Sequence, residues 1–389
     1  MPLPPLVDPG PPLTAAERAR FSRHLLMPGI GERGQRRLRR ARVLVVGAGG
    51  LGSPVLLYLA AAGVGTLGIV DDDVVEPSNL QRQVVHADAD VGRAKTASAA
   101  DAVRALDPLV TVVEHRVRLT AATAPGVLSG YDVVVDGTDT FATRFLLDDA
   151  CALAGLPLVW GAVLRFDAQV SLFWADPPAT SGCAGVRYRD VLGTPPAPGT
   201  VPSCAEAGVL GAVCGVVGST MAVEVVKLLT GTGEPLLGRV LVLDALGGRW
   251  REVPVHPRPG GHPATALADL PDACPSGEAL PTITAPELAA RLAARARGGD
   301  DLDLVDVREP AEHALVAVPG ARLVPRSAFL DGSAFRDLDP GRPLVLHCRS
   351  GARSAEVLAL VRARGFDAVH LAGGILAWVD EVDPTLPRY

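Results

Sequence analysis

The sequence predicts an α/β protein with a Rossmann-like first domain, whose sheet is mixed, and a smaller α/β second domain. Apolar strand patterns alternate with helix patterns between residues 43 and 136, and their short connections are typical of a parallel sheet with crossover helices. The strand at 43–46 leads directly into a run of glycines, after which an alanine-rich helix begins. Such a turn lets a phosphate approach the backbone and the helix N-terminus, so we expect the first domain to bind a nucleotide.

The elements of the first domain follow from capping and periodicity. A helix is expected to begin at Thr14, because Thr14 and Glu17 form a capping box. Long extended runs from 156 to 174 predict that the sheet gains mixed or antiparallel strands. The remaining expected elements are strands at 43–47, 66–70, 111–116 and 132–136, helices at 53–62, 95–106 and 208–230, and a hairpin at 240–255 that turns at Gly247 and Gly248.

Two stretches could be misread. Residues 51–70 carry no charge and are long enough to span a bilayer, but glycines and a proline divide them. We therefore expect a buried helix followed by a buried parallel strand, and no membrane segment. The arginines at 36, 37, 39 and 40 are expected to form a solvated helix face, because runs of charge usually do.

The predicted domains are residues 1–255 and 282–389, joined by a linker at 256–281 that is rich in proline and glycine. In the second domain a helix begins after Thr284, and the pattern predicts strands at 302–307 and 343–347 and a helix at 354–364. A formal net charge of -6 gives no support to nucleic acid as the main partner. Six irregularly spaced cysteines and no basic, apolar leader indicate a cytoplasmic protein with reduced thiols.

Polar motifs beyond the glycines indicate phosphate chemistry. Asp71 ends the second apolar run about 20 residues after the glycines, where such folds place an acid on a ribose hydroxyl. Cations and amides then recur at 78–83, 92–95 and 136–139. A redox Rossmann enzyme needs no such density, whereas a site that splits a nucleoside triphosphate needs cations for the phosphates and a carboxylate for Mg²⁺. The P-loop motif is missing from the sequence.

These motifs, with those at 22–24 and 202–208, resemble the MoeB/ThiF adenylyltransferase family, which is related to ubiquitin-activating enzymes. The resemblance implies that ATP and Mg²⁺ activate the C-terminal glycine of a ubiquitin-like sulfur carrier protein as an acyl-adenylate. By position, Asp71 would hold the ribose and Asp139 the Mg²⁺, while Asn79, Arg82 and Lys95 would hold the phosphates. The predicted nucleotide-binding residues are Gly47, Gly49, Gly50, Asp71, Ser78, Asn79, Leu80, Gln81, Arg82, Lys95, Asp139 and Thr140.

The same resemblance gives roles to an arginine and to several cysteines. Arg23 would reach into the site of a partner subunit, which implies a homodimer, and Arg82 would act in catalysis. Cys204 precedes a helix, where the dipole lowers a thiol's pKa, and family members use this position as an acyl or persulfide acceptor. The family often holds zinc with two Cys-x-x-Cys pairs, of which only Cys183 and Cys274 remain, so we expect no zinc. Cys151 and Cys214 are expected core residues.

In the second domain, Cys348 lies between a buried strand and a helix in the run HCRSGARS. Successive backbone N–H groups in such a loop stabilise a thiolate or persulfide, and Arg349 and Arg353 are expected to add positive charge. A phosphatase is the alternative, but its loop is one residue longer before the arginine. With the motifs at 305–310 and 371–378, the domain resembles a rhodanese. The predicted persulfide loop consists of Cys348, Arg349, Ser350, Gly351, Ala352 and Arg353.

Together the two domains resemble the MoeZ-type adenylyltransferase/sulfurtransferases. The expected product is the thiocarboxylate of the carrier, for molybdopterin, cysteine or related biosynthesis, with sulfur from thiosulfate or the persulfide of a cysteine desulfurase. Two alternatives from other classes are an ATP-dependent tRNA-modifying enzyme and a non-catalytic scaffold that binds the carrier. A scaffold would not need Arg82, Lys95, Asp139 and Cys348 together.

Overall fold

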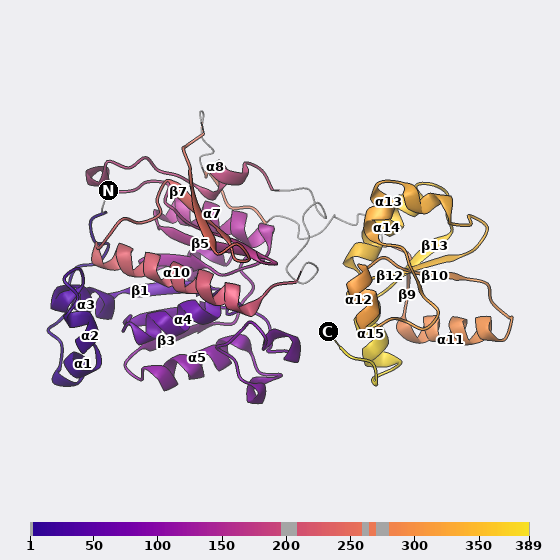
Figure 1. Cartoon of the computed structure of the whole chain (residues 1–389), viewed down its shortest axis with the longest axis horizontal. Helices are drawn as coiled ribbons and strands as arrows, with labels where there is room; N and C mark the ends of the chain where they lie inside the picture. The colour runs from indigo at the N-terminus through magenta and orange to yellow at the C-terminus, as the bar shows by residue number, and fades with distance from the viewer. Residues whose placement is uncertain (1–2, 196–207, 259–263, 270–279, 389) are drawn as a thin grey trace. The chain divides into compact units, whose positions relative to one another are not determined.

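The computed structural model describes residues 3–195, 208–258, 264–269 and 280–388. The chain forms two compact units, Met1–Asp272 and Ala273–Tyr389, each with its own sheet and core (Figure 1). Most of the predicted linker at 256–281 lies outside the described residues. Each unit is described separately below.

The first unit is built on one eight-stranded sheet in the order β3-β2-β1-β4-β5-β6-β7-β8. Strands β1 to β5 run parallel, and β6 to β8 continue the sheet with antiparallel pairing, so the predicted mixed sheet is confirmed. The strands are β1 (Arg42–Val46), β2 (Thr66–Val70), β3 (Thr111–His115), β4 (Val133–Asp136), β5 (Leu158–Leu164), β6 (Asp167–Phe173), β7 (Arg239–Asp244) and β8 (Arg249–Pro254).

Helices cover both faces of this sheet (Figure 1). Val43 and Val45 of β1 point into one core and Leu44 and Val46 into the other, as the two-residue period of a strand dictates. Helices α3 (Gly31–Arg40), α4 (Gly52–Ala61), α5 (Lys95–Leu106) and α10 (Gly211–Thr230) pack on the first core, and α6 (Ala124–Leu128), α7 (Phe141–Ala154) and α8 (Tyr188–Leu192) pack on the second. The short helices α1 (Ala15–Arg20), α2 (Ser22–Leu25), η1 (Pro77–Asn79), η2 (Asp88–Asp90) and η3 (Ala179–Ser181) complete the unit.

The stretch at 51–70 folds as expected, into helix α4 and the fully buried strand β2. Among the described residues, one helix, α10, is long and apolar enough to cross a membrane by length and composition alone. Val217, Met221 and Val225 of α10 are fully buried in the core of the first unit. A Cβ atom on Gly218 would lie 2.3 Å from Pro54 of α4, so the two helices touch at this glycine. Helix α10 is therefore a core helix of this fold.

The four arginines of α3 are not a solvated face, so that prediction is wrong. Three of them are half-buried and bind other segments, whereas Arg40 is exposed. Arg36 donates to the carbonyl of Gly10 at 2.8 Å, and Arg37 donates to those of Val7 and Thr230. These bonds hold the N-terminal segment against α3. Arg39 pairs with Glu17, whose predicted capping box with Thr14 is confirmed.

The second unit contains a five-stranded parallel sheet in the order β11-β10-β12-β13-β9, with helices on both faces. The predicted helix after Thr284 and both predicted strands are confirmed, whereas the other three strands, β9, β11 and β13, were not expected. The strands are β9 (Thr282–Ile283), β10 (Asp303–Asp306), β11 (Arg322–Leu323), β12 (Leu344–His347) and β13 (Ala368–Leu371). The helices are α11 (Ala285–Ala296), α12 (Pro310–Leu315), α13 (Arg326–Leu330), η4 (Ser333–Arg336), α14 (Ala352–Arg362) and α15 (Gly374–Glu381).

A buried ion pair at the end of β10 is expected to support this second fold. Arg308 donates to Asp306 at 2.6 Å and to the carbonyl of Val316 at 2.7 Å, and both charged side chains are fully buried. The Arg308→Met variant removes the charged partner of a buried carboxylate and leaves it the contact with His313, so it should lower the unfolding free energy of this unit by about 3–5 kcal/mol. Hydrogen exchange of peptides from β10 and β12 measures that loss.

The control is Arg388→Met, which breaks a pair with Asp380 in which both side chains are about half exposed. Exposed ion pairs contribute about 1 kcal/mol or less, so the control should change exchange little. Equal losses in the two variants would contradict the importance of the buried pair.

Candidate functional site

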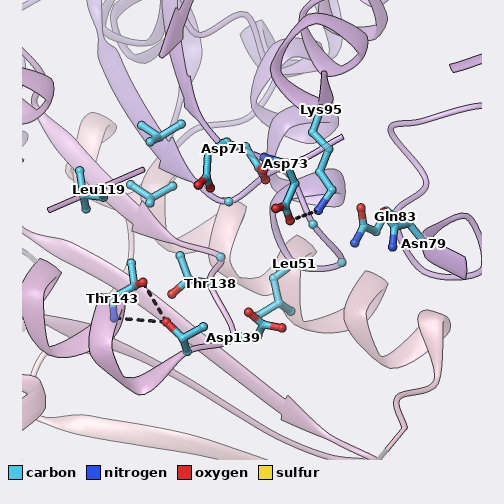
Figure 2. Close-up of a pocket in the computed structure, with 18 of the residues that line it drawn as sticks. Leu51, Asp71, Asp73, Asn79, Gln83, Lys95, Leu119, Thr138, Asp139 and Thr143 are labelled. Atoms are coloured by element: carbon cyan, nitrogen blue, oxygen red, sulfur yellow. Dashed lines mark hydrogen bonds and ion pairs between the residues drawn. The ribbon is translucent and has the colours of Figure 1, made fainter. Parts of the chain in front are cut away.

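A pocket of about 450 Å³ opens in the first unit where β1, β2 and β4 end. Strand β1 pairs with β2 on one side and with β4 on the other, so the pocket lies at the switch point where parallel sheets bind ligands. Figure 2 shows Asp71, Asp73 and Lys95 grouped together, with Thr138 and Asp139 across the cavity from them. The predicted nucleotide residues that line the pocket are Gly47, Gly49, Gly50, Asp71, Asn79, Arg82, Lys95, Asp139 and Thr140.

The glycine turn after β1 forms the floor of this pocket. Gly47 has a φ of +90°, a conformation that side chains rarely allow, and its N–H donates to the carbonyl of Val70. Helix α4 begins at Gly52, where an added Cβ atom would lie 1.8 Å from the carbonyl oxygen of Gly47. The chain can therefore turn from strand to helix at this radius only if position 52 lacks a side chain.

Asp71 is held in place by backbone donors. Its two carboxylate oxygens accept hydrogen bonds from the N–H of Ala48 at 2.8 Å and from that of Asp73 at 2.9 Å. Burial raises the pKa of Asp71, while the positive charge of Lys95 and these two hydrogen bonds act against the rise. The result is an oriented acceptor at the pocket wall, which suits hydroxyl groups of a ligand.

Lys95 begins α5, and its side chain is almost completely buried at the pocket. The ammonium group donates to Asp73 at 2.8 Å, and Asp73 is itself exposed to solvent. Among the described residues, Asp71, Asp72 and Asp73 also form a cluster of three carboxylates near Lys95. A buried ammonium group beside an exposed carboxylate can exchange that partner for a ligand phosphate.

Some predicted residues lie elsewhere. Ser78, Leu80 and Gln81 are not among the residues that line the pocket; Ser78 instead supplies the carbonyl that accepts a hydrogen bond from Arg82. Arg23 is exposed on α2 and is also not among the lining residues, so its expected role toward a partner subunit stays a prediction. Cys204 lies outside the described residues.

Three residues that line or support the pocket were given no role by the motif analysis, although Gln83 lies within the motif at 78–83. Gln83 and Arg144 both line the pocket and are nearly buried. His86 lies behind it, where Nε2 is 3.0 Å from the carbonyl of Ala48, and burial lowers the pKa of this imidazole. The position of Arg144, four residues after Thr140 on α7, is the signal that could have found it, because such residues share a helix face.

Arg144 and Asp136 position the segment that carries Asp139. Asp136 is fully buried and accepts from both the N–H and the hydroxyl of Thr138, at 2.9 and 2.6 Å. Arg144 donates to the carbonyl of Thr138 at 2.9 Å. Thr138 is therefore held through its N–H, its carbonyl and its hydroxyl. These bonds fix the backbone next to Asp139, whose carboxylate is exposed at the pocket.

In the second unit, Cys348 follows β12 and is 1% exposed. The N–H of Gly351 donates to its sulfur at 3.1 Å, and Gly351 adopts a φ of +101° that turns this N–H inward. The carbonyls of Cys348 and Arg349 accept from the first turn of α15, at Ile375 and Leu376. The loop thus directs its carbonyls toward a helix end and an N–H toward the sulfur, as an anion-stabilising loop requires.

The expected contribution of Arg353 needs a correction. Its guanidinium binds both carboxylate oxygens of Glu312, at 2.6 and 2.7 Å, and both side chains are about nine-tenths buried. Because the two charges match, this pair adds a rigid contact between α12 and α14 and little net positive charge. His347, which precedes the cysteine, adds none at neutral pH, because burial lowers its pKa to about 4.

The contact between Gly52 and Gly47 leads to a prediction for the pocket. In Gly52→Ala the added methyl group forces α4 away from the turn, because the carbonyl of Gly47 already fills that space. ATP, the nucleotide that the motifs imply, should bind at least about tenfold more weakly, by calorimetry with a non-hydrolysable analogue. Gly215→Ala is the control, since nothing lies within 4 Å of a Cβ atom there. Unchanged affinity in Gly52→Ala would contradict this geometry.

Buried His347 predicts how acid affects the second unit. The unfolded chain takes up a proton near pH 6.5, whereas the folded ring resists protonation down to about pH 4. Its contribution to stability is therefore complete above pH 6.5 and is lost as the pH falls toward 4. The unfolding free energy, measured with urea between pH 7 and 4.5, should fall less steeply in His347→Phe. His370, whose pKa burial also lowers, leaves part of the slope. An identical slope in variant and wild type would rule His347 out.

Comparisons with known proteins find a match for each of the two units. The family model described as "ThiF family" matches residues 21–264, and the one described as "Rhodanese-like domain" matches residues 288–381. The chain is 50% identical to a "Probable adenylyltransferase/sulfurtransferase MoeZ" of Mycobacterium tuberculosis, over 100% of this chain and 99% of that protein. It is 38% identical to "Adenylyltransferase and sulfurtransferase MOCS3" of Mus musculus, over 99% and 90%.

Two further similarities concern the first unit. A "Sulfur carrier protein adenylyltransferase" of Thermus thermophilus is 50% identical over 63% of this chain and 90% of that protein. The crystal structure of E. coli MccB with MccA-N7isoASN is 21% identical, covers 64% of this chain and 74% of that chain, and has a TM-score of 0.55, which shows the shared fold. The chain belongs to the ThiF family and carries a rhodanese-like domain after its ThiF domain.

Proposed function

We propose that the chain uses ATP to activate the C-terminal glycine of a ubiquitin-like sulfur carrier protein and then converts it into a thiocarboxylate with sulfur carried on Cys348. The chain is an adenylyltransferase and sulfurtransferase, as are relatives that match it over nearly its whole length. The observation that carries the proposal is the presence in one chain of a switch-point nucleotide pocket and an N–H-lined cysteine. An adenylation site alone does not require a sulfur-carrying cysteine, and a sulfur-carrying cysteine alone does not require a nucleotide pocket.

The pocket supports a role for each of its polar residues. The fixed carboxylate of Asp71 accepts hydrogen bonds from the ribose hydroxyls, as such acids do in related folds. Lys95, Arg82 and Asn79 contact the phosphates, with Lys95 leaving Asp73 as the triphosphate enters. Cations there stabilise the negative charge that moves onto the departing pyrophosphate.

The donor set also fits a magnesium ion. Mg²⁺ prefers carboxylate oxygens and phosphate oxygens, and it usually keeps several waters. The Asp139 carboxylate lines the pocket, is exposed, and has no hydrogen bond or ion pair among the described residues. Asp139 would hold the ion, which would neutralise the phosphate charge. The Thr138 backbone, held by Asp136 and Arg144, keeps Asp139 in place.

The first half-reaction forms a carbon–oxygen–phosphorus linkage. A carboxylate oxygen of the terminal glycine attacks the α-phosphorus of ATP, the bond to the β-phosphate oxygen breaks, and pyrophosphate leaves. In the second half-reaction the outer sulfur of a Cys348 persulfide attacks the carbonyl carbon and AMP leaves. A second thiol then cleaves the resulting acyl disulfide and releases the thiocarboxylate; Cys204 is the candidate in this chain. A cellular thiol reduces the disulfide that remains.

Four further parts of the proposal concern the surroundings. The chain acts as a homodimer in the cytoplasm, with Arg23 of each subunit completing the site of the other. The sulfur donor is thiosulfate or the persulfide of a cysteine desulfurase. No zinc is bound, since the sequence offers only Cys183 and Cys274 near the expected positions. The predicted domain limits, 1–255 and 282–389, are part of the same proposal.

The test is intact-mass spectrometry of a small carrier that ends in Gly-Gly, incubated with the full chain, MgATP and thiosulfate. Wild type should add about 16 Da to the carrier, the difference between a sulfur and an oxygen atom. Cys348→Ala should still form the AMP-linked carrier but no thiocarboxylate, whereas Lys95→Met should form neither, because the phosphates lose their buried cation.

Cys183→Ala is the matched control, since this cysteine is half-buried and lies outside both sites. It should behave as wild type. If wild type forms neither product with several carriers, the assignment of the substrate is wrong, and a tRNA substrate is the next to try. Thiocarboxylate formed by Cys348→Ala would instead contradict the role of the cysteine.

A further inference from the structure

A second hydroxyl donor lies beside the sulfur of Cys348. Ser354 belongs to the first turn of α14 and is fully buried. Its Oγ lies 3.6 Å from the cysteine sulfur, 3.0 Å from the carbonyl oxygen of Gly351 and 3.3 Å from Nδ1 of His370. The hydroxyl therefore has three neighbours that can accept its hydrogen.

A serine hydroxyl carries only one hydrogen. If Nδ1 of His370 is bare, it competes with the sulfur for that hydrogen. If Nδ1 carries its own hydrogen, the imidazole donates to Oγ instead, and the hydroxyl hydrogen is left for Gly351 or Cys348. A thiolate or a persulfide anion is then the stronger acceptor, because hydrogen bonds to a charged partner are roughly twice as strong.

The fold fixes the imidazole next to this serine. His370 lies on β13 in register with Leu346 of β12, on the sheet face that α14 covers. Its backbone N–H donates to the carbonyl of Pro281, so the strand is held on its outer side as well. An added Cβ atom on Gly351 would lie 3.8 Å from Cε1 of the ring, which shows how closely the ring packs under the loop.

We propose that His370 is a positioning residue for the sulfur chemistry, in which Nδ1–H donates to the hydroxyl of Ser354 and so directs the hydroxyl hydrogen to the sulfur of Cys348. The cysteine then has two donors, the N–H of Gly351 and this hydroxyl. The inference rests on the proposed role of Cys348 as the sulfur carrier. Under this proposal a residue of β13, outside the loop motif, contributes to the sulfur chemistry.

The charged groups around this network are paired with one another. Arg353 of α14 binds Glu312 of α12, and Arg326 of α13 binds Glu356 of α14. On the other face of the sheet, Asp306 of β10 receives Arg308 and His313, with neutral His347 nearby. Thr282 is the residue of β9 in register with His370, and Arg349 is the further charged residue of the loop. Burial lowers the pKa of His370, so at neutral pH the ring is neutral and carries its one hydrogen on either Nδ1 or Nε2.

The experiment measures how fast iodoacetamide alkylates Cys348 in the full chain as the pH is varied, with peptide mass spectrometry to follow this one cysteine. The pH midpoint reports the thiol pKa, which rises when the thiolate loses a donor. Ser354→Ala and His370→Phe should each raise the midpoint by about one to two pH units. The double variant should equal Ser354→Ala, because His370 acts only through the serine.

Two substitutions of His370 by amide side chains distinguish a positioning role of Nδ1 from a role in packing alone. In His370→Asn the side-chain amide can occupy the place of Nδ1, so the midpoint should stay near that of wild type. In His370→Gln the amide reaches the place of Nε2, and the midpoint should rise as in His370→Phe. His313→Asn is the matched control elsewhere in the same unit, since His313 contacts Asp306, and it should leave the midpoint unchanged.

Equal midpoints in His370→Asn and His370→Gln would overturn the proposal, and so would a further shift in the double variant. Formation of the AMP-linked carrier in the same preparations checks that each variant keeps a folded first unit. Alkylation does not depend on sulfur transfer. A wild type without sulfurtransferase activity would therefore contradict the proposed function, whereas the midpoints alone decide the role of His370.

Discussion

The start of α4 leaves no room for a single methyl group, and the pocket depends on that contact. Because Gly52 lies against the carbonyl of Gly47, the chain turns from β1 into the helix within a few residues. The short turn places Ala48 between Asp71 and His86, so that its N–H holds the carboxylate and its carbonyl meets the imidazole. The same turn lies close to Gly137, which brings the segment of Thr138 and Asp139 to the opposite wall. A local steric constraint thus arranges groups from four separate parts of the chain around one cavity.

The second unit also places its candidate site at a turn between a strand and a helix, but this turn encloses a single atom rather than a pocket. There too a buried parallel strand ends in a glycine-containing turn that begins a helix, and a left-handed glycine directs the backbone. In the first unit the turn leaves a space of about 450 Å³, whereas in the second it closes tightly on one sulfur atom. The difference lies in what faces the turn. Side chains from η1, α5 and α7 line the first turn, whereas in the second the N-terminus of α15 binds the carbonyls of the loop and the N–H of Gly351 points to the sulfur.

The two folds and most of the pocket lining could be predicted from the sequence because those features depend on local sequence patterns. Alternating strands and helices, capping boxes and glycine positions each depend on residues a few positions apart, and most expected elements agree with the structure within a few residues. Side-chain partners could not be predicted in this way. Arg353 meets Glu312, 41 residues earlier, and Arg37 meets the carbonyl of Thr230, 193 residues later. No local pattern distinguishes these arginines from solvated ones. Gln83 lies in the motif at 78–83 and Arg144 lies one helical turn after Thr140, but the local sequence does not show that the fold brings both side chains to the pocket. Cys204, where the family resemblance alone gives a role, lies outside the described residues.

If Cys348 carries sulfur as proposed, its near-complete enclosure means that the free thiol and the persulfide differ in how far the reactive sulfur extends from the loop. In the unloaded state the sulfur of Cys348 is enclosed by its own loop, so the acyl-adenylate at the end of a carrier protein has little access to it. A persulfide adds one sulfur about 2 Å farther out, at the length of a disulfide bond. In the proposed mechanism the reactive sulfur can therefore reach the acyl-adenylate only when Cys348 carries a persulfide. Under the proposed role of Cys348, this burial favours capture of the activated carboxylate by a loop that carries a persulfide over formation of a thioester on a loop that does not.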